Sequence, residues 1–158
     1  MTDNENVYVW YQSLAADTIT ALNSSRTQDY NPTDLNTFNE DVLTNQTVAI
    51  DYDYSGTICG FQWWENGQDG GKIGFSRCMI VVPGGSKCDQ NRLDFDNDWM
   101  GPGQPSGVKQ SLACHEFGHA MGLAHIDPSV TNSCMLDPIS GQQHLSGHDI
   151  AHITNNYP

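Results

Sequence analysis

The segment HEFGHAMGLAH, residues 115–125, constrains the fold more than any other part of the chain. On an α-helix, residues four apart project from nearly the same side, so His115 and His119 can direct imidazole nitrogens at one metal ion. Glu116 is rotated about 100° from His115, which suits a proton acceptor beside the ion better than a third ligand. The segment therefore predicts a helix that carries two metal ligands and a general base.

His125 requires a reversal of the chain. It lies six residues beyond His119, so a continuous helix would carry it about 9 Å further along the axis, which zinc–nitrogen bonds of about 2.0–2.1 Å cannot span. Gly122 can end the helix, because glycine adopts the left-handed conformation without a Cβ clash. We therefore predict a return of the chain that brings His125 to a zinc ion as third ligand. The fourth tetrahedral position then stays open for water, as in catalytic zinc sites.

The N-terminal part of the chain fits two periodicities. Apolar residues within 5–22 fall at helical spacing and predict an amphipathic helix, although Val7, Val9 and Tyr11 also alternate as in a strand. After Asn31-Pro32, Thr33 or Asp34 could cap a second helix. Its apolar residues would be Leu35, Phe38, Val42 and Leu43.

The rest of the chain predicts a sheet followed by helices. Four stretches are rich in β-branched and aromatic residues: TVAIDYDY (47–54), TICGFQWW (57–64), KIGFSRCMIVV (72–82) and RLDFD (92–96). An irregular loop, GPGQPSG (101–107), precedes the motif helix, which we place from about Val108 to Met121. A last helix is expected from about Ser146 to Asn155. This order predicts one α+β domain over residues 1–158.

Charge and cysteine content narrow the partners and the compartment. Acidic residues outnumber basic ones by 19 to 6, and the formal net charge is −13, which argues against nucleic acid or an anionic membrane as partner. The five cysteines show no CxxC pairing and fit two disulfides plus one thiol in an oxidising compartment. Among Cys59, Cys78 and Cys88 we favour Cys78–Cys88, since these two enclose a Pro-Gly-Gly turn. We expect a secreted monomer from which a leader has been removed.

The pattern HExxHxxGxxH over residues 115–125 resembles the metzincin signature. Three further stretches are similar to the matrixin branch of that clan: RLDFDNDWM (92–100), HIDPSVTNSCML (125–136) and HLSGHDIAHITNNY (144–157). The resemblance implies a zincin-like fold, in which a twisted, mostly parallel mixed sheet packs on two main helices. It also implies a Met-turn at Met135 after the motif helix, and then a C-terminal helix. An extended peptide or protein substrate would lie beside an edge strand, with residues 136–143 walling the S1′ pocket.

The resemblance implies two more features of the site. Cys114 and Cys134 occupy places that stack below the metal in metzincins, which favours a disulfide over two buried thiols. Asp94, Asp96 and Asp98 match a region where matrixins hold calcium, and their oxygens could bind Ca²⁺ here, or they could form a solvated acidic loop. Asp94 itself stands where matrixins carry a histidine, so the structural zinc site of the animal enzymes has no counterpart in this chain.

Alternatives to peptidase function stay open at this level. His144, His148 and His152 recur every four residues. If the segment is helical, His148 and His152 share a face and could hold a second metal, although such histidines are more often solvated. A catalytically silent zinc-binding module would keep the metal without needing Glu116, which is intact here. A zinc amidase acting on a non-protein amide would share the metal chemistry and differ only in the shape of its cleft.

Overall fold

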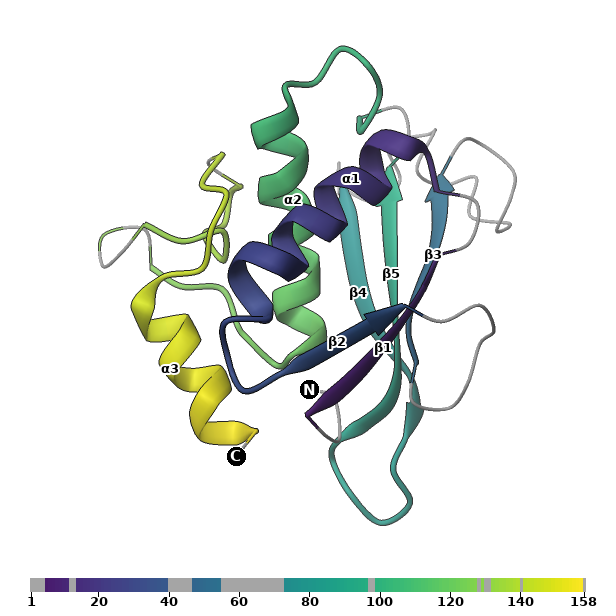
Figure 1. Cartoon of the computed structure of the whole chain (residues 1–158), viewed down its shortest axis with the longest axis vertical. Coiled ribbons are helices and arrows are strands. Elements are labelled where there is room, and N and C mark those ends of the chain that lie inside the picture. Colours follow the sequence, from purple (N-terminus) through teal and green to yellow (C-terminus); the bar gives the residue numbers. More distant parts are fainter. Residues whose placement is uncertain are drawn as a thin grey trace.

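The computed structural model describes residues 5–11, 14–39, 47–54, 73–96, 99–127, 129, 132–139 and 141–157, with backbone only for 47–54. These residues form an α+β fold, shown in Figure 1. The strands are β1 (Asn6–Tyr11), β2 (Asn36–Asn39), β3 (Thr47–Tyr54), β4 (Gly74–Val81) and β5 (Cys88–Asp96). The helices are α1 (Ala16–Ser25), which continues into a π-helical turn at Arg26–Tyr30, α2 (Ser106–Ala120) and α3 (Gly147–Asn156).

The five strands form one mixed sheet in the order β2-β1-β3-β5-β4. All neighbouring pairs are parallel except β4 and β5, which are antiparallel and place β4 at an edge of the sheet. Helices α1 and α2 lie side by side against the sheet, whereas α3 lies apart from it (Figure 1). One buried cluster joins Val7 and Val9 of β1, Phe95 of β5 and Phe117 of α2. The predicted zincin-like architecture is confirmed.

The single helix predicted over residues 5–22 is wrong. The structure has strand β1 up to Tyr11 and begins helix α1 only at Ala16. Val7 and Val9 are both fully buried, because alternate residues of a strand face the same side. The sequence NVYVWY is β-branched and aromatic, and such residues suit a pleated, half-buried surface better than a helix.

The helix predicted after Asn31-Pro32 is also wrong. Strand β2 occupies residues 36–39 and pairs in parallel with β1. The Thr33 hydroxyl donates to the Tyr30 carbonyl at 2.6 Å and accepts from the Leu35 amide at 3.2 Å. Thr33 therefore closes the preceding helical turn instead of capping a new helix. Val42, Leu43 and the predicted strand 57–64 lie outside the described residues.

The remaining elements match their predicted ranges within a few residues. Strand β3 covers 47–54, β4 covers 74–81 of the predicted 72–82, and β5 extends the short predicted strand back to Cys88. Helix α2 begins two residues before Val108, inside the loop predicted over 101–107. Helix α3 begins after Ser146, whose hydroxyl accepts from the Asp149 amide in a capping box.

Candidate active site

Helix α2 ends as the glycine pattern predicts. Gly122 has φ +91°, in the left-handed region. Its amide donates to the His119 carbonyl at 3.0 Å, and the Leu123 amide donates to the Gly118 carbonyl at 2.9 Å. This pair of bonds is the Schellman arrangement, which satisfies the last helical carbonyls and redirects the chain. Past it, the Ile126 amide donates to the Met135 carbonyl at 3.2 Å, which holds the returning segment in place.

The reversal brings three imidazoles together. The Nε2 atoms of His115 and His119 are 3.0 Å apart, those of His119 and His125 are 3.0 Å apart, and those of His125 and His115 are 3.2 Å apart. Within the described part of the chain, this is the one group of three or more His, Cys, Asp or Glu side chains close enough to share a metal ion. The convergence predicted from the spacing is therefore present.

The opposite nitrogen of each ring faces an acceptor. The Nδ1 of His115 lies 2.8 Å from the Cys134 carbonyl, and that of His119 lies 2.8 Å from the Leu123 carbonyl. The Nδ1 of His125 lies 3.3 Å from a carboxylate oxygen of Asp137. Because a carbonyl or carboxylate can only accept, each Nδ1 carries the proton and each Nε2 presents a lone pair.

This donor set fits zinc. Three lone pairs that face one another at 3.0–3.2 Å repel unless a cation lies between them. Tetrahedral zinc with bonds of about 2.0–2.1 Å separates its nitrogen ligands by about 3.3–3.4 Å, so the rings need to move apart by only a few tenths of an ångström. Hydrogen bonds from the distal ring nitrogens to carbonyls and carboxylates are the usual support of metal-binding histidines.

Burial keeps two of these rings in the metal-binding protonation state. Desolvation lowers the pKa of His115 to about 4, against the opposing effect of its hydrogen bond to the Cys134 carbonyl. Desolvation also lowers the pKa of His119, opposed by the Leu123 carbonyl. Both imidazoles are therefore neutral near pH 7, and a neutral imidazole is the form that binds a metal.

The three histidines lie in a cleft of about 850 Å³ that also contains Glu116. Glu116 is 5% exposed, so its carboxylate is largely removed from bulk water. Strand β4 forms one wall through Gly74, Phe75 and Ser76, with Ile73 just before it. The other lining residues are Trp99, Asp137, Pro138 and Ile139. The cleft therefore runs along the edge strand of the sheet, and part of the segment predicted to wall the S1′ pocket lines it.

The segment around Met135 packs directly under α2. Met135 is fully buried, and its sulfur lies so close to Gly118 that a Cβ there would collide with it. A disulfide joins Cys114 of α2 to Cys134, the residue whose carbonyl accepts from His115. The Ser133 hydroxyl accepts from the Met135 amide at 3.0 Å and donates to the buried Asp149 of α3 at 2.6 Å. Helix α3 thereby supports the floor of the site.

Several supporting residues carry no signal in the sequence. Tyr30 is fully buried and its hydroxyl donates to the Cys114 carbonyl at 2.7 Å, although 84 residues separate the two. Asp137, which orients His125, also carries no signal, because the isolated parallel bridge between Ile126 and Leu136 that brings the two residues together forms only in the folded chain. The second disulfide, Cys78–Cys88, is present as favoured, and Cys59 lies outside the described residues.

The acidic group proposed for calcium is used otherwise. Asp94 is fully buried and forms ion pairs with Arg92 at 2.7 Å and Arg77 at 3.3 Å. An Asp96 carboxylate oxygen accepts from the Trp99 amide at 3.2 Å. Asp98 lies outside the described residues. Asp94 therefore bridges two guanidinium groups and is not available to a calcium ion.

The histidines of the C-terminal region do not form a second metal group among the described residues. The Nδ1 of His144 lies 3.0 Å from a carboxylate oxygen of Asp29, and that oxygen also accepts from the Leu145 amide at 3.2 Å. Burial raises the pKa of Asp29, although these two hydrogen bonds oppose the shift. His148 and His152 are exposed on α3. His148 and His152 therefore fit the alternative of solvated histidines. His144 instead links the residues just before α3 to Asp29 in the π-helical turn after α1.

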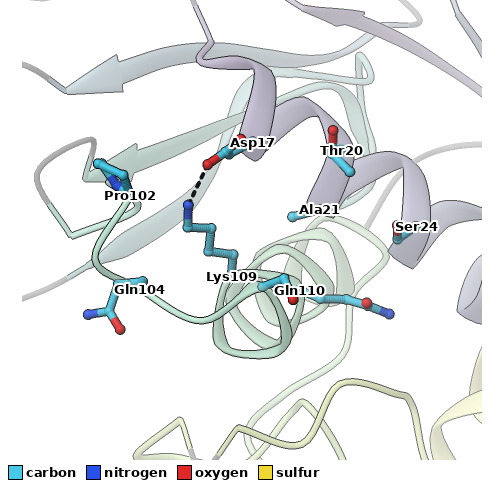
Figure 2. Close-up of a pocket in the computed structure, with 9 residues that line it drawn as sticks. Asp17, Thr20, Ala21, Ser24, Pro102, Gln104, Lys109 and Gln110 are labelled. Carbon is cyan, nitrogen blue, oxygen red and sulfur yellow. Dashed lines mark hydrogen bonds and ion pairs between the residues drawn. The ribbon is translucent and has the colours of Figure 1, made fainter.

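A smaller pocket of about 280 Å³ lies between α1 and the beginning of α2 (Figure 2). The buried Lys109 reaches from α2 to Asp17 of α1, and the ammonium lies 2.8 Å from a carboxylate oxygen. The remainder of the lining consists of two apolar residues, Ala21 and Pro102, and of hydroxyl and amide side chains: Thr20, Ser24, Gln104, Ser106 and Gln110. The ion pair fixes α1 against the helix that carries the histidines.

Comparisons with known proteins agree with this geometry. The family model described as matrixin matches residues 37–158, and a search of curated proteins finds no match. A structure of myroilysin shares 15% identity with a TM-score of 0.57, over 99% of this chain and 81% of that chain. A crystal structure of myroilysin shares 13% identity with a TM-score of 0.56, over 99% and 85%. Metalloproteinase-II from Bacteroides fragilis shares 12% identity with a TM-score of 0.49, over 98% and 54%. Among the described residues, none of the helices is both long and apolar enough to cross a membrane.

Proposed function

Because the chain belongs to the matrixin family, a family of zinc metallopeptidases, we propose that it is a secreted zinc endopeptidase with Glu116 as general base. The ligands are His115, His119 and His125. The observation that carries this proposal is the convergence of three Nε2 lone pairs, each oriented by an acceptor on the opposite side of its ring. Secretion is supported by the two disulfides, which persist in oxidising compartments.

The substrate we propose is an extended peptide lying along β4. This strand is at the sheet edge and lines the cleft through its residues 74–76, so its outer backbone groups can pair with a peptide strand. The side chain that follows the scissile bond would enter the space bounded by Pro138 and Ile139. Backbone pairing holds the peptide in register, and this keeps one carbonyl next to the histidines.

Glu116 performs the proton transfers in this proposal. Zinc, when bound, supplies Lewis-acid chemistry by polarising the peptide carbonyl and by lowering the pKa of water. The Glu116 carboxylate accepts a proton from the attacking water and then delivers it to the leaving amine nitrogen. Its burial excludes competing bulk water. Met135 takes no part in the proton transfers and serves as the buried floor against which Gly118 of α2 packs.

Metal analysis combined with cleavage of a random peptide library tests this proposal. Wild-type protein is expected to contain zinc and to cleave peptides only without a chelator. Glu116→Ala is expected to keep its zinc and lose cleavage by about 10²–10⁴-fold, because the ligands remain and the base is gone. His125→Ala is expected to lose both zinc and cleavage, whereas His152→Ala, on the exposed side of α3, retains both.

Two outcomes would contradict the proposal. Full cleavage by Glu116→Ala would show that this carboxylate is not the base, and unchanged zinc in His125→Ala would show that the third ligand is another residue. Wild-type protein that holds zinc and cleaves no peptide would favour the silent module or an amidase acting on a different amide.

A further inference from the structure

The first residue of β4 lies against the proposed general base. A Cβ built on Gly74 would be 2.5 Å from Oε1 of Glu116, 2.8 Å from its Cγ and 2.8 Å from Cδ1 of Leu112. Real Cβ atoms essentially never approach heavy atoms so closely. Gly74 and Glu116 both line the cleft, so their contact lies at the place where a substrate would react.

Neither backbone is free to move away from this contact. The Ile73 carbonyl accepts from the Asp96 amide at 3.0 Å, and Gly74 and Phe75 are in register with Phe95 and Asp94 of β5. The disulfide Cys78–Cys88 ties the same two strands further along. On the opposite side, Glu116 belongs to the interior of α2, and Leu112 lies one turn before it on the same face.

From this contact we infer that Gly74 is a positioning residue for Glu116, the proposed general base. The strand backbone at Gly74 confines the Glu116 carboxylate to one orientation in the cleft. The inference rests on the proposed function of Glu116. A bare backbone at position 74 leaves room for the carboxylate beside the strand on which the peptide would lie. Any side chain at position 74 has to displace the side chain of Glu116 and the end of Leu112, because the strand and the helix are both fixed.

The substitution Gly74→Ala tests this role. The three atoms nearest to the added Cβ belong to Glu116 and Leu112 and not to a histidine, so zinc content and zinc affinity should equal those of wild-type protein. The carboxylate should move, and kcat is expected to fall by about 10²-fold with little change in KM, since a displacement near 1 Å has that effect on proton transfer. Gly103→Ala is the matched control, because a Cβ there has open space around it.

A stability cycle on the metal-free protein provides the second measurement. If the added methyl group collides with Glu116, Gly74→Ala should lower the unfolding temperature much less in a Glu116→Ala background than in wild-type protein. Gly103→Ala should have the same small effect in both backgrounds. If Gly74→Ala alone does not fold, folding of the double variant supports the contact.

Three results would overturn the inference. The first is equal destabilisation by Gly74→Ala in both backgrounds, the second is failure of both the single and the double variant to fold, and the third is an unchanged kcat in Gly74→Ala. The first two results would point to Leu112 as the side chain that requires glycine. Failure of the proposed function is a separate result, namely wild-type protein without chelator-sensitive peptide cleavage. In that case the stability cycle still decides whether Gly74 confines Glu116.

Discussion

Removal of the disulfide between Cys114 and Cys134 should weaken both the fold and the metal site. The bond closes a loop with a sequence separation of 20. In the chain-entropy treatment such a loop restricts the unfolded chain by about 3.3 kcal/mol at 25 °C. For a domain of this size that corresponds to a fall in unfolding temperature of about 7–13 °C. Replacing both cysteines by alanine therefore gives a loss that is easily measured.

The bond Cys78–Cys88 provides a matched control. Its sequence separation is 10, so the same treatment gives about 2.7 kcal/mol, close to the value for the other disulfide. The two bonds differ in what they support, because Cys134 is the one cysteine of the four whose carbonyl accepts a hydrogen bond from the histidine group, namely from Nδ1 of His115. Similar stability losses are therefore expected with different effects on zinc.

Chemical unfolding of the metal-free proteins measures the stability change without the contribution of bound metal. Competition with a chromophoric chelator then measures zinc affinity in the folded variants. We expect Cys114→Ala with Cys134→Ala to lose about 3 kcal/mol and to bind zinc about 10–100-fold more weakly, the usual cost of disturbing such a supporting group. Cys78→Ala with Cys88→Ala should keep wild-type zinc affinity. Equal zinc affinities in the two variants would refute the link between the disulfide and His115.

Two further substitutions test the supports of the site. Asp137→Ala removes the acceptor that faces Nδ1 of His125, and zinc affinity should fall by about 10-fold, the lower end of such effects because both side chains are partly exposed. The chelator competition described above measures this change, with Asp34→Ala as the control. An unchanged zinc affinity would contradict the assigned role of Asp137. Ser146→Ala removes the cap of α3 and should lower the free energy of unfolding, measured by thermal unfolding, by about 1 kcal/mol. Zinc affinity should stay unchanged. A loss of zinc affinity would mean that α3 supports the metal site more directly than through its cap.

The motif region was predictable because its geometry is local. The two helical ligands follow from the 3.6-residue period, and the turn at Gly122 follows from the conformational freedom of glycine. Both depend on residues within one short segment. The positions of His115, His119 and His125 in the structure agree with that reasoning down to the pair of hydrogen bonds that ends α2.

The N-terminal prediction failed because its outcome depends on distant residues. A short run such as residues 6–11 satisfies helical and strand spacing at once, and intrinsic preferences for strand are strongly dependent on context. Strand β1 forms between β2 and β3, so its hydrogen-bond partners come from residues 36–39 and 47–50. The sequence of the run alone does not contain that pairing.

The ion pairs of Asp94 show how the same non-local contacts reach the active site. Alternating aspartates near a zinc motif can serve as calcium ligands only if no other group of the protein binds their carboxylates. Here Arg77, from the neighbouring strand, forms an ion pair with the carboxylate of Asp94. Arg77 and Arg92 stand opposite each other on β4 and β5, where two like charges would repel, and the carboxylate of Asp94 forms an ion pair with each of them. These ion pairs join the edge strand to β5, and Arg77 lies two residues after Phe75, the register partner of Asp94. Because Gly74 lies three residues before Arg77 on the same strand, these ion pairs also help to hold Gly74 against Glu116.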